Sequence, residues 1–233
     1  MNANFFRLAA LLALLAPAAG AAAQSDRGPE SPRDWMLHLQ FGGYYPSIDD
    51  EAGLAAEPFA QVFDDSQRLL TQLGLERYAF KDFGTLGIGV SVGFVQFYGE
   101  GFFAEGPQAG QRSEDDTSFT VVPLQAYAAY RFDKLALDWA VPLVPYAKAG
   151  VGSWFWWTGG ESGARPGFSY GGGLQILLDY FDRRLARDFD RNVGVNNSYL
   201  FVDWTAWQAD GFGSDGFDLS DDGMFSGGLA LDF

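Results

Sequence analysis

The chain has 233 residues, one histidine, no cysteine and a formal net charge of −15 at pH 7. The lack of cysteine excludes disulfide bonds and a lipid attached to cysteine in this chain, and the negative charge disfavours nucleic acid as a partner. Only 19% of the residues are charged, whereas 17% are aromatic and 30 are glycine, a composition that fits strands of alternating apolar and small residues.

Residues 1–23 have the features of a secretory signal peptide. Arg7 precedes an apolar run at residues 8–15, and the alanines at 21–23 before Gln24 form an A-x-A cleavage site. The run is shorter than the roughly 20 residues that a transmembrane helix needs, and no later stretch reaches that length. A membrane-spanning form would therefore be a barrel. The predicted organisation is a signal peptide at 1–23, a short periplasmic segment at 24–34 and an outer-membrane barrel at 35–233.

Two-residue alternation predicts the strands of this barrel. Between residues 85 and 98, for example, Ile88, Val90 and Val92 alternate with Gly89 and Ser91, which gives one apolar face and one small or polar face. The predicted fold is all-β, an eight-stranded antiparallel up-and-down barrel. It is narrow enough for side chains to fill its interior. The strands are expected at 35–45, 70–80, 85–98, 117–132, 144–157, 168–179, 198–208 and 223–233.

The connections between these strands differ in charge and length. Outer loops are predicted at 46–69, 99–116, 158–167 and 209–222, and they hold 17 acidic residues against three arginines. Inner turns are predicted at 81–84, 133–143 and 180–197, with a short periplasmic helix over 179–191, where apolar residues recur at helical spacing. Partly helical spacing at 50–69 indicates a folded first loop. Pro123 predicts a bulge or an earlier start of the fourth strand.

Aromatic residues gather near the predicted strand ends. They indicate the two aromatic girdles of an outer-membrane barrel rather than a carbohydrate-binding platform. The outer girdle is predicted to contain Tyr44, Tyr45, Phe97, Tyr98, Trp154, Phe155, Trp156, Trp157, Trp204 and Trp207, and the inner girdle Phe80, Phe83, Tyr130, Phe132, Trp139 and Phe233.

Charged residues inside the strands are expected in the lumen, because a Lys or Arg that faces lipid at the midplane costs about 2–4 kcal/mol. Arg77 falls on the outer face near a strand end, from which it could reach the headgroups. The polar network is expected to stabilise a closed lumen, and a narrow gated channel is the alternative. The predicted network consists of His38, Gln40, Glu76, Gln125, Arg131, Lys148 and Asp203.

No catalytic residue is predicted. The only histidine, His38, lies near the periplasmic end of the first strand, so no nucleophile–base–carboxylate set can form at the outer rim. An outer-membrane lipid-modifying enzyme is the alternative. A soluble lipocalin-like barrel is disfavoured, because the third strand offers small and polar residues to the lumen.

The last outer loop interleaves aspartate with glycine, as flexible oxygen cages for Ca²⁺ do. Calcium ligands are predicted here, and a solvated acidic loop is the competing interpretation. Divalent ions could also be shared with lipopolysaccharide phosphates. The candidate ligands are Asp210, Asp215, Asp218, Asp221 and Asp222.

The last strand carries a pattern that resembles the C-terminal insertion signal of bacterial outer-membrane barrels, with Ser226, Gly228, Leu231 and the final Phe233. The resemblance implies the barrel-assembly machinery as a partner, in an environment of outer-membrane lipid and lipopolysaccharide in a Gram-negative envelope.

Five segments together resemble a family of small outer-membrane barrel proteins from myxobacteria and their relatives. They are YYPSIDD at 44–50, FGTLGIGV at 83–90, YRFD at 130–133, PLVPYAKAG at 142–150 and GVNNSYLF at 194–201. The resemblance implies an outer-membrane barrel without an established activity or site residues. It leaves open a role as a divalent-ion-dependent component of an envelope or motility complex.

Overall fold

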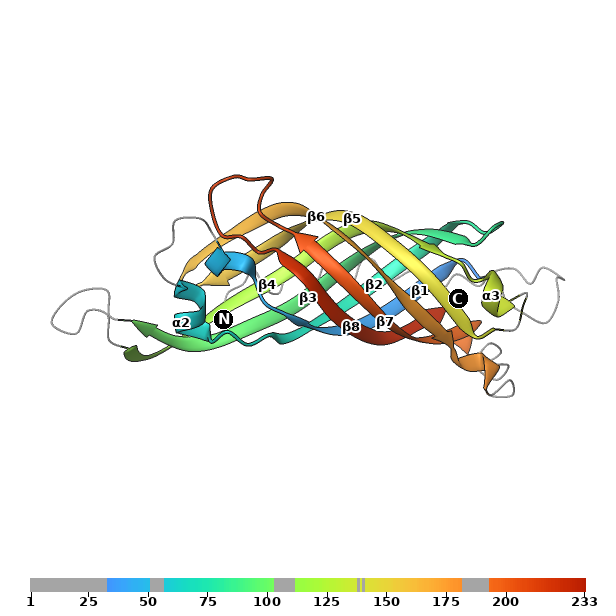
Figure 1. Cartoon of the computed structure of the whole chain (residues 1–233), viewed down its shortest axis with the longest axis horizontal. Coiled ribbons are helices and arrows are strands. Elements are labelled where there is room, and N and C mark those ends of the chain that lie inside the picture. The colour runs from blue at the N-terminus through green and yellow to red at the C-terminus, as the bar shows by residue number, and fades with distance from the viewer. Residues whose placement is uncertain (1–32, 51–56, 103–111, 138, 140, 182–192) are drawn as a thin grey trace. The chain divides into compact units, whose positions relative to one another are not determined.

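The computed structural model describes residues 33–50, 57–102, 112–137, 139, 141–181 and 193–233. Within them the chain forms a closed antiparallel barrel in which each of eight strands pairs with the next and the last pairs with the first (Figure 1). The predicted fold is confirmed. The predicted signal peptide at 1–23 lies outside the described residues.

The elements follow one another as hairpins, with short helical segments between some strands. No helix in the described ranges is long and apolar enough to cross a membrane. The elements are β1 (Trp35–Tyr44), η1 (Ser47–Asp50), α2 (Pro58–Phe63), β2 (Arg68–Phe80), β3 (Thr85–Phe102), β4 (Arg112–Arg131), α3 (Lys134–Leu137), β5 (Leu143–Thr158), β6 (Glu161–Leu177), η2 (Leu178–Tyr180), β7 (Asn197–Gln208) and β8 (Asp221–Asp232).

The predictions of helical segments between the strands have different outcomes. The first loop is folded as predicted, since it contains η1 and α2. Of the predicted helix at 179–191, Asp179 and Tyr180 lie in the 3-10 turn η2, and residues 182–192 lie outside the described part of the chain. The second inner turn contains α3, which the sequence pattern did not indicate.

Seven of the eight strands are longer than predicted, and β3, β4 and β6 show the largest extensions. β3 extends to Phe102, and β4 already begins at Arg112. The prediction of a loop at 158–167 is wrong, because Thr158 pairs with Glu161 across a two-residue turn. Gly159 and Gly160 form this turn with φ angles of 48° and 98°, in the region that favours glycine. Each predicted strand already met the roughly 9–11 residues needed to cross lipid, and these ladders continue beyond the predicted ends.

The bulge predicted at Pro123 is wrong. Pro123 pairs with Trp154 of β5 in unbroken register, and the β3–β4 register is the same before it, at Val92↔Leu124, and after it, at Val95↔Val121. Proline has no N–H to donate to the ladder. Pro123 therefore interrupts the β3–β4 pairing locally, and it does not add an extra residue to β4. The other alternative, an earlier strand start, agrees with β4 beginning at Arg112.

The strands alternate between an apolar outer face and a mixed inner face. Ile88, Val202 and Leu229 are 61%, 61% and 51% exposed on the outside, whereas glycines are common on the inside. Gly87 shows why, because a Cβ there would overlap the carboxylate of Glu76. Small residues on the inner face of β3 thus leave room for large side chains from other strands.

We call the end of the barrel where β1 begins and β8 ends the terminal end, and the opposite end the distal end. In Figure 1, α2 lies at the distal end and α3 at the terminal end, beside the C-terminus. Two apolar clusters fill the lumen near these ends. The terminal cluster contains Met36, Ala136, Val144, Leu177, Tyr199, Phe201 and Ala230.

The larger distal cluster is mostly aromatic, and it corrects the girdle prediction. Tyr44, Phe97, Trp154 and Trp207 are at most 1% exposed and pack inside the barrel, so they do not belong to an outer girdle. Tyr98 and Trp157 do lie on the outer surface, with 66% and 42% exposure. The distal cluster contains Tyr44, Ile48, Phe59, Phe63, Leu70, Val95, Phe97, Phe119, Val121, Trp154, Trp207, Ala209, Leu219 and Met224.

The ladder that closes the barrel, between β1 and β8, is the shortest. It has seven paired positions, from Met36↔Asp232 to Gly42↔Ser226. The β5–β6 ladder, by comparison, runs from Leu143↔Ile176 to Thr158↔Glu161 without interruption.

Candidate functional site

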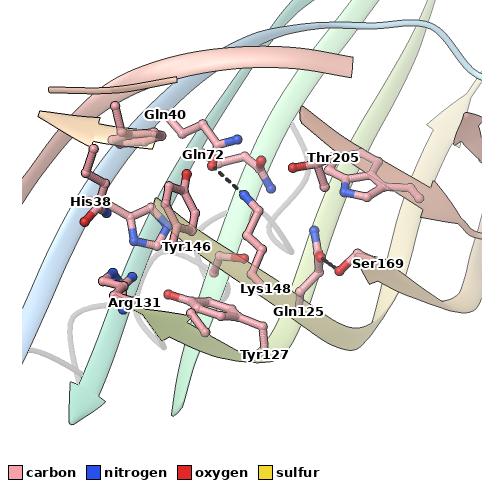
Figure 2. Close-up of a pocket in the computed structure, with 15 residues that line it drawn as sticks. His38, Gln40, Gln72, Gln125, Tyr127, Arg131, Tyr146, Lys148, Ser169 and Thr205 are labelled. Atoms are coloured by element: carbon pink, nitrogen blue, oxygen red, sulfur yellow. Dashed lines mark hydrogen bonds between the residues drawn. The ribbon is translucent and has the colours of Figure 1, made fainter. Parts of the chain in front are cut away.

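A polar layer lies in the lumen between the two apolar clusters and surrounds a cavity of about 40 Å³. Figure 2 shows the side chains that line it, with Lys148 reaching in among glutamines, hydroxyls and aromatic rings from several strands. Of the seven residues predicted to form a lumenal network, five line this cavity: His38, Gln40, Gln125, Arg131 and Lys148. The other two, Glu76 and Asp203, are buried partners of these cations.

Asp203 on β7 is the centre of the first polar group. Its Oδ2 accepts hydrogen bonds from Lys148 Nζ at 2.5 Å and from the Tyr146 hydroxyl at 2.8 Å. Its Oδ1 accepts from Gln40 Nε2 at 3.2 Å and from the Ser226 hydroxyl. Four donors from β1, β5 and β8 thus satisfy one buried carboxylate, as a charge in a low-dielectric interior requires.

The second polar group is a bidentate ion pair. Arg131 on β4 donates through both terminal nitrogens to Glu76 on β2, at 2.8 Å for Nη2 to Oε2. The two side chains are 6% and 0% exposed. Because β3 lies between them, the pair forms over the glycine-rich inner face of that strand. Arg131 also lies against the Tyr146 ring, 5.8 Å from its centroid.

The remaining predicted residues are separate from the ion pairs. Gln125 accepts a hydrogen bond from the Ser169 hydroxyl at 2.7 Å. His38 packs edge-on against the rings of Tyr127 and Phe201, at centroid distances of 5.9 and 6.3 Å. The imidazole of His38 thus lies among aromatic rings in the lumen.

Sequence analysis did not include several residues of the polar layer. Tyr146 binds Asp203, and Ser226, considered only for the insertion signal, bonds to both Gln40 and Asp203. The signal that would have found them is strand parity, since Tyr146 lies two residues from Lys148 on one face. The same parity identifies further lining residues: Gln72, Ser91, Tyr127, Ser169, Gln175 and Thr205.

The first loop closes the distal mouth of the barrel. Asp49 accepts hydrogen bonds from the backbone N–H groups of Phe59, at 2.7 Å, and Ala60, at 2.8 Å, and so holds the start of α2. The Tyr45 hydroxyl also donates to Asp49, at 3.3 Å. Burial, reinforced by Asp49, raises the pKa of Tyr45 to about 12, so this donor keeps its proton at neutral pH. The helix inserts Phe59 and Phe63 into the distal cluster.

The last loop, which follows β7, is held by a buried cation. The Arg165 guanidinium on β6 donates to the backbone carbonyls of Asp210, of Ser214 at 2.6 Å and of Asp215 at 2.8 Å. It also donates to the Ser214 hydroxyl at 3.2 Å. Arg165 was expected in a loop, but the extended β6 places it inside the distal mouth, where it is 7% exposed. The loop carbonyls therefore converge on a side-chain cation.

Replacing Arg165 with alanine is expected to release this loop while the strands stay paired. Limited proteolysis of the folded protein should then cut between residues 209 and 220 at least several-fold faster than in the wild type. The matched control is Arg112→Ala, since Arg112 contacts Gln61 and Glu100 at the exposed distal rim. Equal cleavage rates in all three proteins would contradict a role for Arg165 in holding the loop.

The five candidate calcium ligands do not converge. Asp210, Asp218 and Asp221 accept hydrogen bonds from the backbone N–H groups two residues ahead, and Asp215 and Asp222 are exposed. Within the described ranges, no group of three or more His, Cys, Asp or Glu side chains is arranged to hold a metal ion. Calcium binding stays a prediction, and the contacts of Arg165 argue against it.

A thermal comparison tests the calcium hypothesis directly. We expect the folded and heat-unfolded forms, separated by gel shift, to interconvert at the same temperature in Ca²⁺ and in EDTA. The reason is that Arg165 already occupies the position at which loop carbonyls meet. A transition several degrees higher in Ca²⁺ would overturn this expectation and restore the loop as an ion site.

The terminal mouth is closed by a different polar group. Arg33 lies within 3.4 Å of Asp133 and 3.5 Å of Asp232, and so bridges the ends of β4 and β8. The final residue takes part in closure as well, because the Phe233 backbone bonds to Asp34 and Trp35. Of the predicted insertion signal, Ser226 and Gly228 face the lumen, and Leu231 pairs with Leu37 and Ser198. Recognition by the assembly machinery stays a prediction.

No family model matches the chain, and no curated protein matches it. Similar solved structures include the outer membrane protein OprG from Pseudomonas aeruginosa, at 12% identity over 88% of this chain and 97% of that one, with a TM-score of 0.49. Neisserial surface protein A matches at 12% identity over 85% and 96%, with a TM-score of 0.46.

A third similar structure is Ail, the attachment invasion locus protein of Yersinia pestis, at 14% identity over 88% of this chain and 99% of that one, with a TM-score of 0.41. Identities and TM-scores this low carry no argument about function. The barrel assignment rests on the closed strand order of this chain.

Proposed function

We propose that this chain is an integral outer-membrane β-barrel that serves as a structural or surface-interaction protein and does not conduct. One observation carries the proposal: a closed barrel with a continuous apolar outer face and a side-chain-filled lumen. Side chains as large as Phe225 and Val151 are 78% and 61% exposed on that face. In water such an apolar surface would promote aggregation, whereas in a bilayer it contacts the apolar lipid chains.

The proposed orientation places the terminal end in the periplasm and the distal end outside the cell. The distal end carries the folded first and last loops and many of the acidic side chains. Among barrels of this kind, turns are generally short on the periplasmic side and loops longer outside. The connections around β2 follow this rule, whereas the two-residue β5–β6 turn does not, so the orientation rests mainly on the acidic distal loops. A surface role would use these distal loops. A role tied to divalent ions in an envelope or motility complex is the alternative, and the thermal comparison in Ca²⁺ and EDTA tests it. Assembly by the barrel-insertion machinery and contact with lipopolysaccharide belong to the same proposal.

An epitope tag tests both the location and the orientation. We expect the Gly159–Gly160 turn to accept an insertion, because a Cβ at either glycine would meet no atom within 4 Å. A tag there should be labelled by antibody on intact cells. A matched tag at Asp82, in the terminal β2–β3 turn, should be labelled only after the outer membrane is opened. Labelling of neither tag before cell lysis would contradict a place in the outer membrane.

The alternative functions are tested on the purified protein. In planar bilayers the refolded barrel should show no discrete conductance steps, because both ends of its lumen are filled by buried clusters. Regular steps would favour the narrow channel. Lipid deacylation by purified outer membranes, lost on deletion of the protein, would favour a lipid-modifying enzyme.

A further inference from the structure

We propose that the cavity in the polar layer is a binding site for a small cluster of water molecules, enclosed between the terminal and distal clusters. The first support is size. The cavity measures about 40 Å³, and a site for one water needs roughly 10–15 Å³ on this measure. About three water molecules would therefore fit.

The second support is the part of the Lys148 side chain that remains accessible to water. Lys148 points into the lumen from β5, yet 20% of its side chain remains accessible (Figure 2). Lys148 lines the cavity, so its accessible surface is available to a molecule bound there.

The third support is a pair of polar atoms without a partner. Gln175 Oε1 and Thr205 Oγ1 belong to residues that are 2% and 3% exposed, and both residues line the cavity. Neither atom has a hydrogen-bond partner within the described residues. Buried polar atoms are nearly always paired with protein or with ordered water, and a polar site of this volume is where bridging water is expected.

The charges of the lining show which ligand fits. Its Lys and Arg side chains are already neutralised, Lys148 by Asp203 and Arg131 by Glu76. Besides Arg131 Nε, the polar groups that remain for a ligand are amides and hydroxyls, which donate and accept without net charge. A neutral molecule that does both is therefore favoured over an ion, and water is the smallest such molecule.

Oxygen-17 magnetic relaxation dispersion on the detergent-refolded barrel tests the proposal, because it counts water molecules that stay bound for longer than bulk exchange allows. We expect two or three long-lived waters in the wild type. Removal of two of the unpartnered acceptors, in Thr205→Val combined with Gln175→Met, should lower the count by at least one. The control is Thr71→Val on the outer face of β2, which should leave the count unchanged.

Two results would overturn the proposal: no long-lived water in the wild type, or the same count in the double variant as in the control. Should the double variant fail to show the heat-dependent gel shift of a folded barrel, xenon replaces it as the probe. A dry cavity binds xenon, so xenon binding in the lumen would overturn the proposal, and an unchanged water count under xenon would support it. None of these outcomes alters the location or the non-conducting role of the barrel, which the epitope tags and bilayer recordings test separately.

Discussion

Glu76→Ala should destabilise the barrel by about 3–5 kcal/mol, the range found when one partner of a buried ion pair is removed. The variant leaves the Arg131 guanidinium in the lumen with no carboxylate, where its two terminal nitrogens now donate to Glu76. Glu76 is 0% exposed, and water that enters the space left by its side chain cannot supply the negative charge that Arg131 loses. Urea unfolding in lipid bilayers, followed by tryptophan fluorescence, measures the loss.

The matched control is Glu100→Ala, which removes an acidic partner of Arg112 at the distal rim. These two side chains are 53% and 60% exposed, and exposed pairs are worth only about 0–1 kcal/mol. The double variant Glu76→Leu with Arg131→Met should recover most of the stability, since it removes both buried charges together. Equal losses for Glu76→Ala and Glu100→Ala would show that the lumenal pair is hydrated and not a buried contact.

Trp154→Ala should cost about 3–5 kcal/mol, as truncation of a buried aromatic residue generally does. Trp154 is 0% exposed in the distal cluster, with its ring 5.4 Å from that of Trp207. Truncation leaves a cavity bounded by strand residues that the closed barrel holds at fixed positions, so little collapse is available. The temperature of the heat-dependent gel shift and urea unfolding both report the loss.

Trp157→Ala is the matched control, because it changes the same residue type on the same strand but on the opposite face. Trp157 is 42% exposed on the outer surface, so its loss removes an interfacial anchor and creates no internal cavity. We expect a clearly smaller effect. Equal destabilisation by the two substitutions would contradict the assignment of Trp154 to the lumen and return it to a girdle.

The sequence predicted the fold because the two-residue period is strong where the inner face is small, as in β3. It also indicated which charges point inward, since lipid excludes them from the outer face. The sequence could not show which of these charged side chains form ion pairs with one another. The partner of Glu76 depends on the register of β2, β3 and β4 together, and nothing local in the chain specifies that register. The contact between Glu76 and Arg131 crosses a whole strand, over Gly87 and its neighbours.

The aromatic residues were misplaced for a different reason, because their strand parity already indicated the correct face of the barrel. Trp154 and Trp156 have the strand parity of Lys148, and Trp207 has that of Asp203. Parity alone would have placed them in the lumen, but grouping them by height along the barrel placed them in a girdle. Arg165 was misplaced for another reason. The strands extend past the length that lipid requires, and no rule based on membrane thickness predicts that extension.

The short β1–β8 ladder has a consequence for the order of assembly. Seven of the eight ladders join strands that are consecutive in the chain, whereas the closing ladder joins Met36 to Asp232, roughly 200 residues away. Bringing such distant segments together is slow, because chain entropy is lost before contacts compensate for it. An open sheet with β1 and β8 as free edges is thus the expected last intermediate, and such edges invite pairing with other chains. The protein is therefore most prone to aggregation before β1 and β8 pair.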